Sequence, residues 1–127
     1  AIHMDPLVRQ FLEVSAETMA HAGYGRKDLW NRKVGVYVGS RMANYAERIV
    51  DRMKTSVVGV AQNFIAAHVS HFFNFKGPNM VVDTACSSSL VSLHLACRAI
   101  LSGECEMAMA GGVDILLDEI PYVELSE

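Results

Sequence analysis

The sequence lacks an excess of charge of one sign, and it has no basic block. Its 127 residues carry 11 Lys and Arg against 14 Asp and Glu, a formal net charge of −3. Because nucleic-acid-binding domains carry a basic patch or stripe, we expect no nucleic-acid partner. No apolar run approaches the roughly 20 residues that a helix needs to cross a bilayer, so we also expect no membrane association.

Cysteine is scarce as well. The three cysteines, Cys86, Cys97 and Cys105, are odd in number and have no CxxC spacing. This pattern fits a reducing compartment better than a disulfide framework. The first residues, AIHMD, do not show the basic segment and apolar stretch of a signal peptide. We therefore expect a cytoplasmic protein.

Apolar residues are abundant and form alternating helical and strand patterns. They make up 51% of the chain, which predicts either two or more buried layers in at most one domain or a large surface for a partner. Asp5-Pro6 predicts a helix start that ends near Gly23, because Asp caps free N–H groups and Pro is tolerated in the first turn. The further elements expected are a loop at 25–32, strands at 34–38, 80–85 and 107–113, and helices at 45–53, 57–73 and 87–101. Their order predicts an α/β fold with a mostly parallel sheet covered on both faces.

Cys86 falls at the junction of an expected strand and an expected helix. In open α/β sheets, ligands gather at the carboxyl ends of strands. The free N–H groups and partial positive charge of a helix start favour a thiolate, and they can stabilise the oxyanion that forms when a thiolate attacks a thioester. Small neighbours (Ala85, Ser87, Ser88) permit a tight turn. From the residues alone, Cys86 is either a nucleophile or a small core residue.

The helix expected at 87–101 should hold Cys86 rigidly. We expect its apolar side chains to be buried; these are Leu90, Leu93, Ala96, Ala99 and Ile100. Serines 87–89 are expected to accept hydrogen bonds from N–H groups of the first turn. Cys97 is expected in the core.

Other chemistry-bearing residues form weaker patterns. His68 and His71 lie three apart on an expected helix, but no third ligand follows at a suitable spacing, and zinc sites have three or four. We therefore expect no metal site. His94 is expected to be a packing residue rather than a general base, and Cys105 to be unreactive.

The stretch VDTACSSSL, residues 82–90, resembles the active-site signature of β-ketoacyl synthases, in the form found in modular polyketide synthases and related fatty acid synthases. Four further segments recur in that family in the same order: MDP (4–6), GVYVG (35–39), Gly77-Pro78 and AGGV (110–113). Residues 117–127 resemble the continuation in bacterial polyketide ketosynthases. The resemblance extends over essentially the whole chain, which is thereby identified as a ketosynthase of the bacterial modular type.

This resemblance implies the thiolase fold, with two similar halves. Residues 1–127 would be most of the first half, without its opening strand, so this is a partial domain. The resemblance implies an acyltransferase in which Cys86 accepts an acyl chain from the phosphopantetheine of an acyl carrier protein. The Cys86 N–H would be one oxyanion donor, and no metal or directly bound cofactor is implied. A malonyl-type extender then loses CO2, and its carbanion attacks the Cys86 thioester, as in fatty acid biosynthesis.

The family also implies a homodimer paired through strand 80–84, and association with other polyketide synthase domains. Its two catalytic histidines come from the second half, and the five histidines here stand in no matching context; they are His3, His21, His68, His71 and His94. The chain alone is therefore expected to be inactive in condensation. Two alternatives remain: a ketosynthase that transfers acyl chains without extending them, and a non-catalytic scaffold or association module in which loss of Cys86 is harmless.

Overall fold

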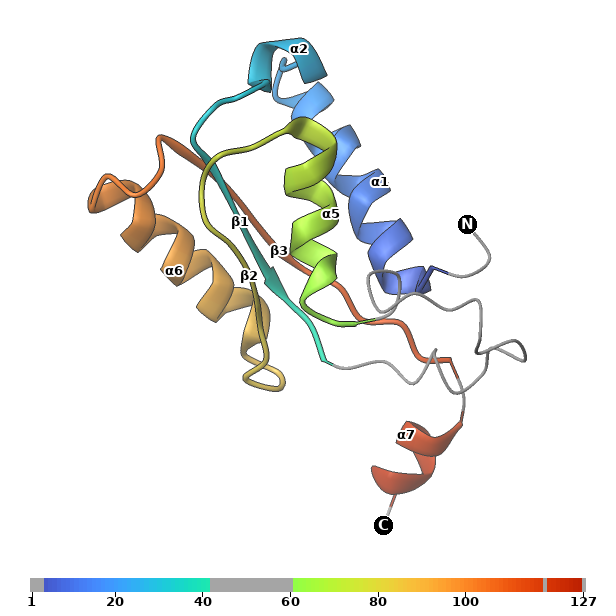
Figure 1. Ribbon diagram of the computed structural model, residues 1–127. Helices are drawn as coiled ribbons and strands as arrows, with labels where there is room; N and C mark the ends of the chain where they lie inside the picture. Colours follow the sequence, from blue (N-terminus) through green and yellow to red (C-terminus); the bar gives the residue numbers. More distant parts are fainter. Residues whose placement is uncertain (1–3, 42–60, 118, 127) are drawn as a thin grey trace.

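A parallel sheet of three strands forms the centre of the molecule (Figure 1). The computed structural model describes residues 4–41, 61–117 and 119–126. Its elements are α1 (Pro6–His21), α2 (Arg26–Leu29), β1 (Val34–Gly39), α5 (Phe64–Phe73), β2 (Asn79–Val82), α6 (Ser88–Leu101), β3 (Met107–Gly112) and α7 (Ile120–Glu124). The strand order is β2-β1-β3, and both pairings are parallel.

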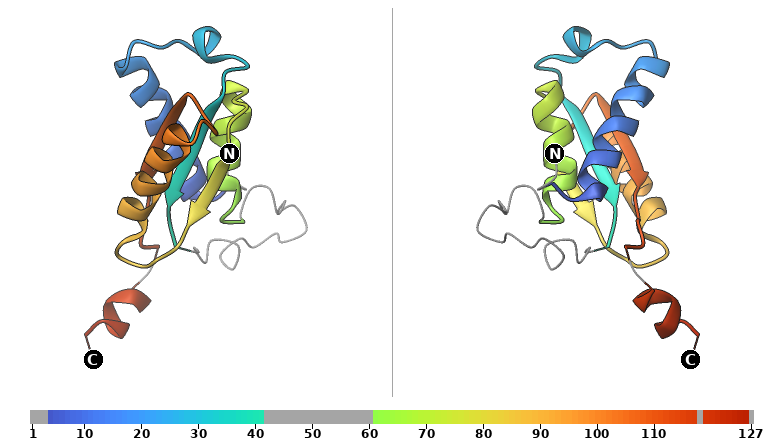
Figure 2. Two further views of the ribbon diagram at one scale, coloured as in Figure 1. Left: turned by 90° about the vertical axis from the view of Figure 1, so that its left-hand side faces the viewer. Right: turned by 90° about the vertical axis from the view of Figure 1, so that its right-hand side faces the viewer.

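Strand β1 lies in the middle of the sheet, and all six of its residues are buried. Its β-branched and aromatic side chains suit a strand that is covered on both faces. Figure 2 shows α1 and α5 on one face of the sheet and α6 on the other. The predicted parallel sheet with helices on both faces is therefore confirmed.

Helix α1 begins as its first residues predict. The Leu7 N–H donates to Asp5 Oδ1 at 2.8 Å, and Pro6 occupies the first turn. The helix ends before Gly23, whose φ of 89° is a conformation that glycine adopts without strain. The main core lies between α1, α5 and the sheet; it includes Leu7, Val8, Phe11, Met19, Val36, Val38, Ile65, Val69, Phe73 and Met109.

Several predicted boundaries need correction. The helix expected at 57–73 begins at Phe64 in the described part, after a turn at 62–63. Residues 57–60 of the expected helix lie outside the described ranges. The helix expected at 45–53 lies wholly outside them. The strand expected at 80–85 is Asn79–Val82, because the chain turns at 83–87 to form the elbow before α6.

Short helices replace two expected irregular segments. Within the loop expected at 25–32, α2 forms because Asp28 Oδ2 accepts the Gly25 N–H at 2.7 Å. The Arg26 guanidinium lies 4.5 Å from the Phe72 ring centroid, and its Nε donates to the Phe72 carbonyl, which ties α2 to α5. Helix α7 forms near the C-terminus, where no element was predicted.

Helix α6 buries a different face from the one predicted. Its buried residues are Ser88, Ser92, Ala96 and Ala99. Leu90 and Leu93 are 72% and 51% exposed, and Ile100 is 44% exposed, so their predicted burial is wrong in this chain. The small side chains face the sheet because only they let the helix approach β1 and β3 closely. The large apolar side chains consequently point away from the sheet.

Candidate active site

Cys86 lies in a tight elbow between β2 and α6, as the sequence predicts. Ala85, immediately before it, has a φ of 55°, in the left-handed region. Among L residues with a Cβ this conformation is uncommon, and it favours small side chains. The turn is closed by the Ala85 N–H, which donates to Asp83 Oδ1 at 3.1 Å. Cys86 itself is exposed.

The serines hold the elbow rather than cap the helix. Ser88 Oγ accepts the Thr84 N–H at 2.8 Å and donates to the Ala85 carbonyl at 2.6 Å. Ser87 Oγ donates to the Thr84 carbonyl at 2.8 Å. No side chain caps the first turn of α6, so the predicted capping role is wrong. The hydroxyls instead bridge the two sides of the turn that carries Cys86.

Two glycines bring the start of α6 onto the ends of two strands. A Cβ atom on Gly39, the last residue of β1, would lie 2.5 Å from the Ser89 nitrogen. A Cβ atom on Gly112, the last residue of β3, would lie 2.9 Å from Ser89 Cβ. The absence of these side chains places the elbow directly at the carboxyl ends of β1 and β3.

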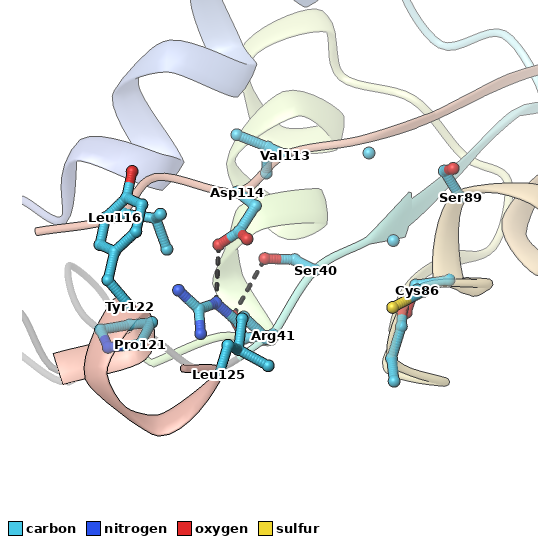
Figure 3. A pocket seen from close by; sticks show the side chains of 14 residues that line it. Ser40, Arg41, Cys86, Ser89, Val113, Asp114, Leu116, Pro121, Tyr122 and Leu125 are labelled. Carbon is cyan, nitrogen blue, oxygen red and sulfur yellow. Dashed lines mark hydrogen bonds and ion pairs between the residues drawn. The ribbon is translucent and has the colours of Figure 1, made fainter. Parts of the chain in front are cut away.

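A cleft of about 680 Å³ opens at this end of the sheet, with Cys86 in its wall. Figure 3 shows Cys86 and Ser89 on one side, and Leu116, Pro121, Tyr122 and Leu125 on the other. The described residues that line it are Gly39, Ser40, Arg41, Ala85, Cys86, Ser88, Ser89, Gly112, Val113, Asp114, Leu116, Pro121, Tyr122 and Leu125. The apolar side chains opposite Cys86 suit an acyl chain, and the exposed thiol suits attack on a carbonyl carbon.

Sequence reasoning missed the residues across the cleft from Cys86. Arg41 and Asp114 form an ion pair there, with Nε and Oδ1 2.8 Å apart. Each follows an expected strand, so the rule that sites collect at the carboxyl ends of strands could have found them. The apolar residues of 116–125 had no such signal, because they come from a segment without an expected element.

The other two cysteines differ sharply from Cys86. Cys97 was expected in the core, but it lies exposed on the outward face of α6, and the prediction is wrong. Cys105 is 3% exposed and packs with Tyr37, Ala96 and Ala99. Burial raises the pKa of its thiol, which keeps it protonated and agrees with the expectation that it is unreactive.

The histidines in the described part of the chain do not line the cleft. His94 is exposed on α6, so it is not the packing residue that we expected. His71 is exposed on α5, and the His68 ring lies 6.2 Å from the Phe64 ring. Within residues 4–41, 61–117 and 119–126, no three His, Cys, Asp or Glu side chains are placed to hold a metal ion. None of the helices in these ranges has the length and apolar character that crossing a membrane requires.

The chain is similar to a known protein family and to several known proteins. Residues 1–127 match the family described as "Beta-ketoacyl synthase, N-terminal domain". The chain is 44% identical over 124 residues to hybrid PKS-NRPS synthetase 1 of Dothistroma septosporum, covering 94% of this chain and 3% of that protein. It is 42% identical over 118 residues to 5-methylorsellinic acid synthase of Aspergillus terreus, covering 91% of this chain and 5% of that protein. The chain thus spans a small part of these fungal relatives.

Solved structures of bacterial ketosynthases share the fold. The ketosynthase from module 6 of the bacillaene synthase of Bacillus subtilis 168 is 37% identical, with a TM-score of 0.84, over 97% of this chain and 21% of that one. The oxazolomycin ketosynthase domain KS7 of Streptomyces albus JA3453 is 39% identical, with a TM-score of 0.86, over 98% of this chain and 22% of that one. The thiolase-like fold that the sequence predicted is confirmed. The chain belongs to the β-ketoacyl synthase family, in the form that polyketide synthases contain.

Proposed function

We propose that Cys86 is the nucleophile that accepts an acyl chain from the phosphopantetheine of an acyl carrier protein. The observation that carries this proposal is the place of Cys86: an exposed thiol at a strained elbow, in the wall of a cleft at the carboxyl ends of β1 and β3. We propose that the Cys86 N–H, which lies just before α6, donates to the oxyanion.

The chemistry of the first step follows from these groups. The Cys86 sulfur attacks the thioester carbonyl, and the new sulfur–carbon bond forms as the carbonyl oxygen takes the negative charge. When the oxyanion collapses, the bond to the pantetheine sulfur breaks, and the proton of the Cys86 thiol ends on the released pantetheine thiol. Small residues around Cys86 leave room for the pantetheine arm. The apolar side of the cleft, at Leu116, Tyr122 and Leu125, accepts the chain.

The second step needs groups from outside this chain. A malonyl-type extender on the carrier protein loses CO2, its carbanion attacks the Cys86 thioester, and the Cys86 thiolate leaves to give a β-keto product. We propose that the histidines for this step belong to a second half of the domain. Residues 1–127 would then be most of the first half, inactive in condensation by themselves.

The setting of this segment is part of the same proposal. A modular bacterial synthase is supported by the bacterial structures, while the curated relatives named above are fungal. We propose that the protein works in the cytoplasm with other polyketide synthase domains, as its relatives are parts of such synthases. Its pairing as a homodimer is supported by strand β2, an outer strand of the described sheet on which Asn79 and Met80 are exposed. An outer strand of this kind is a common pairing surface. We expect no bound metal or cofactor to take part.

Peptide mass spectrometry after incubation with a short acyl-pantetheine thioester tests the nucleophile. We expect acyl label on Cys86 and not on Cys97, the matched exposed cysteine of the neighbouring helix. Cys86→Ala should abolish the label, while Cys97→Ala should leave it unchanged. The experiment is run on the 127-residue chain and on the full-length protein. Equal labelling of both cysteines, or no label on Cys86 in the full-length protein, would overturn the proposal.

Two other functions give different results. A ketosynthase that only transfers acyl chains would label at Cys86 but form no β-keto product when malonyl carrier protein is added to the full-length protein. A scaffold would keep its association in the Cys86→Ala variant and would show no label. Label at Cys86 followed by β-keto product supports the condensing function over both.

A further inference from the structure

Among the described residues that line the cleft, two side chains are charged, and they are paired with each other. Arg41 Nε and Asp114 Oδ1 are 2.8 Å apart, and the side chains are 43% and 54% exposed. The twelve other lining residues in the part of the chain that the structure describes are uncharged. Figure 3 shows the Arg41 guanidinium turned toward Asp114, with Cys86 across the cleft. Within the described lining, the charge of Arg41 is therefore balanced by this one contact with Asp114.

The register of the sheet creates this pair. Gly39 of β1 pairs with Gly112 of β3, the last residues of their strands. Arg41 and Asp114 each lie two residues beyond that rung, although 73 positions separate them in the chain. Because parallel strands end at the same edge of the sheet, both side chains reach the cleft that contains Cys86.

A second ion pair joins the same two strands at their other end. Arg32 Nε and Glu106 Oε1 are also 2.8 Å apart, and they precede β1 and β3. This pair does not line the cleft. It offers a matched control, since its two charged atoms are the same distance apart and it joins the same two strands, but it does not line the cleft.

We propose that the Arg41–Asp114 pair determines the charge selectivity of the cleft, so that Cys86 accepts uncharged acyl groups in preference to those with a free carboxylate. The proposal rests on the proposed function of Cys86. Asp114 occupies the guanidinium that would otherwise attract a substrate carboxylate, so the paired cleft offers a carboxylate no counter-charge. The step remains the thioester exchange described above. Selection of this kind keeps Cys86 from being blocked by the malonyl group of the extender.

The two members of the pair have opposite predicted effects. Asp114→Asn leaves Arg41 unpaired in the cleft, which should favour a carboxylated acyl group. Arg41→Gln leaves Asp114 unpaired, and its negative charge should disfavour a carboxylated acyl group. If the pair only held β1 and β3 together, both substitutions would change the preference for a carboxylated acyl group in the same direction. The sign of the effect therefore separates selectivity from bracing.

The test compares acylation of Cys86 by butyryl-pantetheine and by succinyl-pantetheine, which have four-carbon acyl groups and differ by one carboxylate. The full-length protein and its variants are compared at low ionic strength by intact mass. For partly exposed charges we expect the succinyl-to-butyryl rate ratio to rise roughly two- to fivefold in Asp114→Asn and to fall by a similar factor in Arg41→Gln. Added salt should reduce both shifts.

Two further variants complete the test. Glu106→Gln, which breaks the pair at the far end of the strands, should leave the ratio unchanged. The double variant Arg41→Asp with Asp114→Arg exchanges the two charges and should return the succinyl-to-butyryl rate ratio toward that of the unchanged protein. Because it keeps an ion pair between the strands, it also tests the proposal if a single variant fails to fold. Acylation with a ratio that moves the same way in both single variants, or not at all, would overturn the selectivity alone. No acylation of Cys86 by either thioester in the unchanged protein would overturn the proposed function and this proposal with it.

Discussion

The last residue of β1 and the first turn of α6 touch backbone to backbone: a Cβ atom on Gly39 would lie 2.5 Å from the Ser89 nitrogen. The same Cβ would lie 2.6 Å from the Ser88 carbonyl carbon. Backbone atoms of a helix start cannot yield as the end of a flexible side chain can. The contact therefore sets how far the elbow with Cys86 extends beyond the sheet.

Gly39→Ala should destabilise the protein because the added methyl group forces α6 away from β1. Overpacking of this kind costs about 1–3 kcal/mol of unfolding free energy. Urea denaturation followed by circular dichroism measures the loss. Gly111→Ala is the matched control, since its Cβ would meet Phe11 Cε2 at an ordinary 3.7 Å. Equal stability of the two variants would contradict the close approach of α6.

Ala85→Val should slow acylation of Cys86. A β-branched side chain is disfavoured at the φ of 55° that residue 85 adopts, so the elbow must change shape and move the thiol. A displacement of this kind should lower the acylation rate by about tenfold or more. Ala85→Gly, which accepts the same φ, should retain the rate. Rates are read from intact mass with a butyryl-pantetheine donor, and a fast Ala85→Val variant would argue against a strained elbow.

Leu93→Gln should have little effect on the unfolding free energy of the 127-residue chain but should lower its self-association. Leu93 is 51% exposed on an apolar face that also includes Leu90 and Leu101, and such patches promote association. Surface substitutions of this kind change stability by less than about 0.5 kcal/mol. Sedimentation velocity and denaturant titration measure the two effects.

Ala96→Gln provides the contrast, because Ala96 is buried against the sheet. This variant should lose stability, since the larger amide side chain cannot be accommodated between α6 and β1. A large loss of stability in Leu93→Gln, matching that of Ala96→Gln, would mean that the leucine face is buried after all.

The Arg32–Glu106 pair should make stability depend on pH in the acid range. The hydrogen bond from Arg32 lowers the pKa of Glu106 below its ordinary 4.5. A carboxyl whose pKa is depressed on folding stabilises the folded state above its unfolded pKa, and this contribution is lost as the pH falls through the folded pKa. The Tm difference between the protein and Glu106→Gln should thus be constant near neutrality and shrink below about pH 4.5. A Tm difference that grows as the pH falls would contradict the ion pair between Arg32 and Glu106.

Local residues in the sequence were sufficient to predict most elements. Asp5-Pro6 predicts the start of α1 because the capping carboxylate and the helix are neighbours in the chain. The β-branched run of β1 predicts a buried strand because its side chains show that character in any covered sheet. The stretch around Cys86 predicts the elbow and the family, since the nucleophile, its small neighbours and its serines are contiguous.

The choice of buried face on α6 could not be made in this way. Hydrophobicity alone predicts Leu90 and Leu93 as core residues, yet Ser92 and Ala96 are the buried ones. The deciding factor is the distance between α6 and the strands, which Gly39 and Gly112 make short. Gly39 and Gly112 lie far from Ser89 in the sequence, and they come into contact with it only when the chain folds.

The sequence by itself thus determined the elements, the family and the position of Cys86, because each depends on residues that are close along the chain. Only the tertiary structure decided which residues face Cys86. Arg41 and Asp114 are 73 positions apart, and neither is distinctive in its local context. They meet because the parallel register of β1 and β3 brings the ends of both strands to one edge, and an ion pair across strands depends on that register rather than on any local pattern.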